Sequence, residues 1–139
     1  MTKKLCSACL LGASCRYDGK SKNNKKVIAL ARKEILMPVC PEQLGGLPTP
    51  REPAEQKGRE VFTKSGKRVT RAFRKGAEEV LKLAKQLGVK EAILKQRSPS
   101  CGNGRIYDGT FSGTIIKGNG VTAELLKRKG LKVISEEEL

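Results

Sequence analysis

Short apolar runs alternate with amphipathic stretches along this chain of 139 residues. The apolar runs predict β-strands at residues 4–9, 34–40, 90–95 and 131–135. The amphipathic stretches predict helices at residues 25–33, 69–87 and 120–129. In the longest helix, apolar residues recur every three or four positions from Val69 to Leu87, and Gly88 follows as a stop signal. This mostly alternating β and α order favours an α/β fold, a Rossmann-like and mostly parallel sheet with flanking helices.

The connection from residue 41 to residue 60 lacks either pattern. It contains four prolines between Pro41 and Pro53, and proline is incompatible with a helix interior or a central strand. We therefore expect no regular structure in this connection. Long loops inside compact domains are more often functional than simple connections.

The length of the chain predicts a single domain, residues 1–139, because a chain of this size is large enough to form its own core.

The composition adds a strong positive charge. Lys and Arg number 29 against 14 Asp and Glu, for a formal net charge of +15. This charge suggests an anionic binding partner. The basic residues are not confined to one tail, because they are spread from Lys3 to Lys132. Two Tyr and three Phe are few for a platform that stacks single-stranded bases. A solvated Lys-rich surface and a weak attraction for phosphate are the two simpler interpretations.

The sequence also narrows the cellular compartment. The segment after Met1 is too short and too mixed for a secretory signal, and no stretch approaches the roughly 20 apolar residues of a membrane span. We therefore expect a cytoplasmic protein that does not enter a membrane. In that reducing compartment the five cysteines are better suited to be metal ligands or reactive thiols than disulfide partners.

Three of the cysteines, Cys9, Cys40 and Cys101, lie at or just past the ends of predicted strands. The carboxyl ends of parallel strands meet at one edge of a sheet, so we expect these thiols to converge. Thiolates select zinc, copper(I) or an iron-sulfur cluster. A structural zinc would need a fourth ligand, and in a chain without histidine Cys6 is the candidate. A strand, however, would separate Cys6 from Cys9 by about 10 Å. A cluster held by three cysteines leaves one iron open as a Lewis acid.

A series of motifs occurs in order along the chain: SACLLG, RYDG, PVCPE, GLPTPR, SPSCG, IYDGTFSG and GNGVTAELL. Together, from Ser7 to Val133, they resemble the thiouracil desulfidase (TudS) family, long catalogued as a domain of unknown function. The resemblance implies an enzyme with a 4Fe-4S cluster that removes sulfur from thiolated pyrimidines without net redox change. It implies that the substrate sulfur binds the open iron, and that Cys9, Cys40 and Cys101 are the three cluster ligands. Cys6 and Cys15 are not required by the motifs, and we expect both to be small buried apolar residues.

Hydrolytic desulfidation needs a group that activates water and a group that supplies a proton. Glu42, two residues after Cys40 on a proline-constrained turn, is the predicted general base. Ser98 is predicted to orient the substrate or relay a proton, with Ser100 as the second choice; either serine could instead stabilise the turn. Asp18 and Asp108, which each follow a tyrosine and precede a glycine, are predicted to form turns.

Donors to a base carbonyl or a nucleotide phosphate are predicted at Thr49, Arg51, Lys95 and Arg97. The glycine pattern lacks a complete dinucleotide or Walker motif, so no cofactor other than the cluster is indicated. We expect a small-molecule substrate, a thiolated pyrimidine base or its nucleotide. Thiouridine monophosphate is favoured because its phosphate would use the positive charge. A thiolated tRNA, a zinc-stabilised basic nucleic-acid-binding module and a C-x-x-C dithiol protein are the alternatives.

Overall fold

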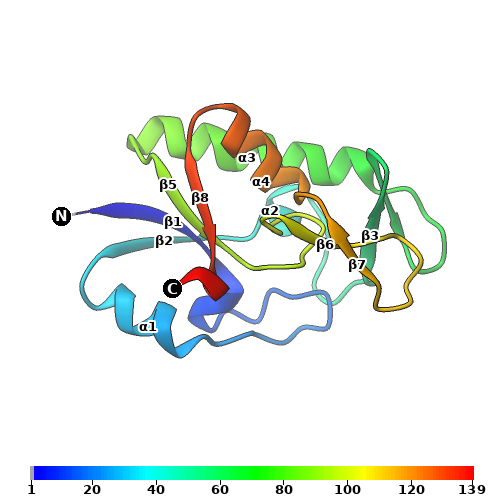
Figure 1. Ribbon diagram of the computed structural model, residues 1–139, viewed down its shortest axis with the longest axis horizontal. Coiled ribbons are helices and arrows are strands. Elements are labelled where there is room, and N and C mark those ends of the chain that lie inside the picture. Colours follow the sequence, from blue (N-terminus) through cyan, green and yellow to red (C-terminus); the bar gives the residue numbers. More distant parts are fainter. Residues whose placement is uncertain (1) are drawn as a thin grey trace.

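The computed structural model describes residues 2–139. Its central sheet contains four parallel strands in the order β2-β1-β5-β8. The strands are β1 (Lys3–Ser7), β2 (Ile35–Val39), β5 (Glu91–Leu94) and β8 (Lys132–Ser135). The predicted α/β architecture, a parallel sheet flanked by helices, is confirmed (Figure 1).

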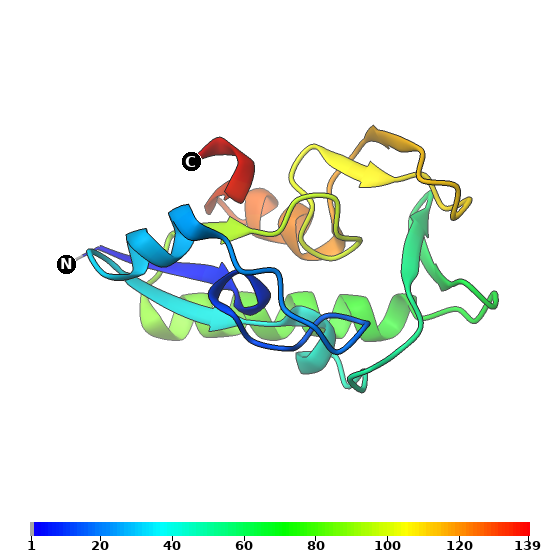
Figure 2. The same cartoon turned by 90° about the horizontal axis from the view of Figure 1, so that it is seen from below.

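Helices cover both faces of this sheet. Helices α3 (Thr70–Leu87) and α4 (Val121–Arg128) lie on one face and α1 (Lys25–Ala31) lies on the other (Figures 1 and 2). Successive strand side chains point to opposite faces, so Leu5 joins the core under α3 and α4 whereas Cys6 joins the core with Val27 of α1. Burial on both faces explains why the strands are continuous apolar runs in the sequence.

The connection from residue 41 to residue 60 is more regular than its prolines predict, and that expectation is wrong. Pro41 begins helix α2 (Pro41–Leu44), because the first turn of a helix does not need the N–H that proline lacks. After Pro53, strand β3 (Ala54–Lys57) pairs with β4 (Glu60–Thr63) in an antiparallel hairpin. The prolines therefore mark the boundaries of short elements.

The remaining elements are also short. Strand β1 ends at Ser7, and Cys9 lies in the 3-10 turn η1 (Ala8–Leu11) that follows it. Strands β6 (Arg105–Tyr107) and β7 (Ile115–Lys117) form a second hairpin, and the turn η2 (Glu136–Glu138) follows β8. Both hairpins lie beyond the carboxyl ends of the parallel strands (Figure 1). Among the helices of residues 2–139, none has the length and apolar character needed to cross a membrane.

Helices α2 and α3 approach each other with their backbones in contact. A Cβ atom on Gly76 of α3 would lie 1.9 Å from the carbonyl oxygen of Pro41, and one on Gly45 would lie 2.0 Å from that of Ala72. Only glycine fits at such distances. The contact fixes α2 against α3 and thereby fixes the backbone of Cys40 and Glu42.

Replacement of Gly76 by alanine tests this contact. In an ordinary helix the change would stabilise by up to about 1 kcal/mol, but here the added methyl group meets backbone, and we expect destabilisation by about 1–3 kcal/mol or more. Denaturant unfolding measures the difference, with Lys75→Ala at an exposed position of the same helix as the control. A stabilised Gly76→Ala variant would contradict the close approach of the two helices.

Candidate active site

A cavity of about 470 Å³ lies at the carboxyl ends of the parallel strands. Its wall includes Cys9 after β1, Cys40 after β2 and Cys101 in the loop after β5. The expected convergence of these three thiols at one edge of the sheet is observed. Cys15, from the loop between η1 and α1, lies on the same wall, and all five cysteines of the chain are free.

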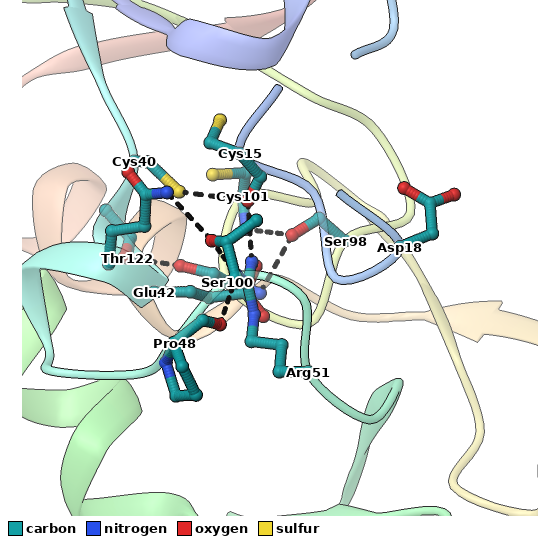
Figure 3. Close-up of polar contacts among 12 residues, drawn as sticks. Cys15, Asp18, Cys40, Glu42, Pro48, Arg51, Ser98, Ser100, Cys101 and Thr122 are labelled. Carbon is teal, nitrogen blue, oxygen red and sulfur yellow. Dashed lines mark hydrogen bonds and ion pairs between the residues drawn. The ribbon is translucent and has the colours of Figure 1, made fainter. Parts of the chain in front are cut away.

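The cavity thiols lie near one another; Cys9, Cys15 and Cys101 are buried and Cys40 is half-buried. The Cys15 side chain interacts with those of Cys40 and Cys9, and the Sγ of Cys40 donates to the carbonyl oxygen of Cys15 at 3.7 Å. Figure 3 shows Cys15, Cys40 and Cys101 gathered in one place. Cys6 is fully buried in β1, as expected for a small core residue. Cys15 is also buried and belongs to the same apolar cluster as Cys6, as expected, and its side chain in addition lines the cavity.

The thiols on this wall are the type of donor that an iron-sulfur cluster uses. Within residues 2–139, no three Cys, Asp or Glu side chains are grouped so that they could hold one metal ion. A structural zinc would need four ligands about 2.3 Å from the same centre. In a 4Fe-4S cluster each thiolate binds a different iron atom. Cys9, Cys40 and Cys101, with Cys15 on the same wall, offer the donors that such a cluster uses.

Burial favours the thiol form of two candidate ligands, Cys40 and Cys101, when no metal is bound. It raises the pKa of Cys101 to about 12. The neighbouring Cys15 thiol, together with burial, raises the pKa of Cys40 above its ordinary range. Thiolates are the form that binds metal, so binding must release these protons.

The predicted base, Glu42, lies in the first turn of α2 and lines the same cavity. Its Oε2 accepts a hydrogen bond from Nη2 of Arg51 at 3.0 Å. Within the described part of the chain, the cavity wall includes neither Arg51 nor Thr49. Thr49 accepts hydrogen bonds from Arg51 and from Gln43, at 3.0 Å and 2.8 Å. Arg51 therefore contacts Glu42 from outside the cavity wall, and Thr49 in turn contacts Arg51.

The two predicted serines differ in position. Ser98 lines the cavity, and its Oγ accepts hydrogen bonds from the backbone N–H groups of Ser100 and Cys101, at 3.1 Å and 3.0 Å. The Ser98 hydroxyl proton is left free to donate toward the cavity. Ser100 is 1% exposed, and its hydroxyl pairs with that of Thr122 at 2.9 Å. The geometry favours Ser98 over Ser100 for contact with a substrate.

Lys95 and Arg97 line the cavity but already have acidic partners. Their ion pairs are with Glu136 at 3.4 Å and Glu137 at 2.7 Å, both in η2. Sequence reasoning missed three other basic residues on the wall, Arg16, Lys22 and Lys64. Arg16 pairs with Asp18 at 3.3 Å, whereas within residues 2–139 the two lysines form no ion pair. Their ammonium groups are free to meet an anionic group of a ligand.

Aromatic side chains complete the cavity, and sequence reasoning missed them too. Tyr17, Tyr107 and Phe111 line it, three of the five aromatic residues of the chain. The two aspartates that follow the tyrosines accept hydrogen bonds from backbone N–H groups two residues further on, which confirms that Asp18 and Asp108 form turns. The repeated Tyr-Asp-Gly sequence could have indicated these tyrosines. Its aspartate marks a turn, and the tyrosine before the aspartate lies on the same loop. Flat rings of this kind can stack on a planar base.

The fold and the site together define a class of protein. It is a parallel α/β domain with a cavity at the carboxyl ends of its strands, and thiols, a carboxylate and aromatic rings line this cavity. A model of the 2-thiouracil desulfurase family matches residues 5–138. The chain belongs to this family, and the resemblance carried by its motifs is confirmed.

Two known proteins are similar to this chain over nearly its whole length. The uncharacterized protein YbbK of Bacillus subtilis (strain 168) is 46% identical over 145 residues, which cover 97% of this chain and 96% of that protein. A solved structure of a 4Fe-4S-dependent thiouracil desulfidase, TudS, superposes with a TM-score of 0.94 at 48% identity and covers 100% of this chain and 93% of its own.

Proposed function

We propose that this protein hydrolyses the carbon–sulfur bond of a thiolated pyrimidine with a 4Fe-4S cluster held by Cys9, Cys40 and Cys101. The observation that carries the proposal is the convergence of these thiols on a cavity that also contains Glu42. The stated cofactor and substrate of the solved relative support it. When bound, the cluster would supply one open, Lewis-acidic iron that binds the thiocarbonyl sulfur and withdraws charge from the ring carbon. The five free thiols are consistent with a cytoplasmic enzyme.

The protein side chains supply the proton transfers. Within residues 2–139 Oε1 of Glu42 has no hydrogen-bond partner, so this oxygen can accept a proton from the water that attacks the ring carbon. Ser98 donates its free proton to the substrate or passes a proton to the departing sulfur. Tyr17, Tyr107 and Phe111 hold the ring plane. The products are the pyrimidine carbonyl compound and hydrogen sulfide, and no electrons are gained or lost.

The cavity is suited to a nucleotide. Its volume of about 470 Å³ must accommodate the proposed cluster together with the substrate. Lys22 and Lys64 offer free positive charge on its wall. We therefore propose thiouridine monophosphate as the preferred substrate over free thiouracil.

Comparison of these substrates at low and high salt tests the proposal. We expect a higher specificity constant for the nucleotide, with a gap that narrows as salt screens the lysines. The variant Lys22→Gln/Lys64→Gln should lower this constant by roughly 5- to 10-fold for the nucleotide and leave the free base nearly unchanged. Lys75→Gln on the exposed face of α3 is the control.

Three outcomes would change the assignment. Equal specificity constants without a salt effect would mean that the positive charge has no part in substrate recognition. Faster turnover of a thiolated tRNA than of either small molecule would make the RNA the substrate. Absence of sulfide release from all three, in protein loaded with its cluster, would contradict the proposed activity itself.

A further inference from the structure

Arg51 has almost no capacity left to bind a substrate. Its side chain is 6% exposed. A guanidinium group has five N–H donors, and four hydrogen bonds leave its Nη atoms. Nη1 donates to Pro48 O and Thr49 Oγ1, each at 3.0 Å, and Nη2 donates to Cys15 O at 2.9 Å and Glu42 Oε2 at 3.0 Å. The fifth donor, on Nε, is buried without a partner in residues 2–139.

The same residue joins two segments of the cavity wall. Through Nη2 it links Glu42 on α2 to the carbonyl of Cys15. Its backbone N–H donates to the carbonyl of Tyr17 at 2.7 Å, so the loop is held at two points. Glu42, Cys15 and Tyr17 all line the cavity. Arg51 therefore sets the distance between the carboxylate and the loop that faces it (Figure 3).

We infer that Arg51 is a positioning residue for Glu42. It holds Oε2 in place, so Oε1 is the oxygen that meets the attacking water. The inference rests on the proposed function in one respect, that Glu42 is the general base. Lysine cannot replace Arg51, because a single ammonium group lacks the planar fork that reaches a carboxylate and two loop carbonyls together. Displacement of a catalytic group by about 1 Å is enough to cost on the order of 10²-fold in rate.

Arg51→Met removes the guanidinium but keeps much of the side-chain length. We expect kcat to fall by about 10- to 100-fold, with KM for free thiouracil within about twofold of the wild-type value and with normal iron and sulfide contents. Arg51→Lys should recover little of the loss. Arg68→Met is the matched control, because Arg68 forms an exposed ion pair with Glu60 away from the cavity. A raised KM with unchanged kcat would show instead that Arg51 binds the substrate.

A double-mutant cycle with Glu42→Gln separates this inference from the proposed function. If Arg51 acts through Glu42, Arg51→Met costs little more in the Glu42→Gln background. An equal loss of kcat on Arg51→Met in both backgrounds would overturn this inference and leave the proposed function intact. Wild-type turnover by Glu42→Gln would overturn the proposed base.

A crystal structure of the Arg51→Met variant gives a readout independent of turnover. The Glu42 carboxylate should leave its position beside the carbonyl of Cys15, and an unmoved carboxylate would contradict the inference. If Arg51→Met does not fold, Arg51→Lys serves for both the kinetic and the structural measurement, because it keeps the charge and the stem.

Discussion

Replacement of Cys101 by alanine is expected to abolish the iron-sulfur cluster and, with it, all desulfidation. Cys101 is the one proposed ligand that comes from the loop after β5, and its neighbour Ser98 fixes its backbone N–H. Removal of this thiol leaves one iron without a ligand, and within residues 2–139 Cys6 is buried in β1 and not positioned to substitute. Loss of visible absorption in anaerobically prepared protein measures the effect.

The same loss is expected for Cys9→Ala and Cys40→Ala. Cys6→Ala and Cys15→Ala are the matched controls, and we expect them to retain most of the visible absorption. For Cys15 this is a demanding control, because its thiol lies on the cavity wall beside those of Cys9 and Cys40. A cluster retained in Cys101→Ala would refute the proposed ligand set.

The Glu42→Gln variant is expected to bind iron and sulfide normally and to desulfidate at least about 10²-fold more slowly, the scale of a lost general base. Glutamine keeps the size of the side chain, and its amide oxygen can still accept from Arg51, so the change is confined to proton transfer. Single-turnover release of sulfide from loaded protein measures the chemical step.

Glu78→Gln, at an exposed position of α3, is the control for the loss of one negative charge. Wild-type turnover by Glu42→Gln would require another base. Asp18 is a poor substitute, because one of its oxygens accepts from the backbone N–H of Lys20 and the other pairs with Arg16 at 3.3 Å.

The parallel sheet could be predicted from sequence because its strands are buried on both faces and its helices have one apolar stripe each. The strand order β2-β1-β5-β8 could not, since the apolar pattern of one strand does not identify its neighbours. The hairpin of β3 and β4 was missed for a different reason. These strands are short and largely polar, and Val61 is buried in a cluster with Val69 and Phe73 at the start of α3, which are distant in the apolar pattern.

The positions of the cavity thiols could be predicted because each follows a strand of the same sheet. The direction of a side chain within a loop could not. Ser98 and Ser100 are two residues apart in one turn, yet the first faces the cavity and the second faces Thr122. Arg51 seemed from its motif to be a substrate donor, and only the folded chain shows that Glu42 and three other acceptors already use its Nη groups.

The iron, sulfide and zinc contents of protein purified without oxygen test the central claim most directly. The three proposed ligands should hold roughly four iron atoms and four sulfide ions per chain, and the protein should be brown and sensitive to oxygen. Colourless protein with one zinc per chain would contradict the account. It would favour the zinc-stabilised nucleic-acid-binding module, which explains the same cysteines and the charge of +15 without desulfidation.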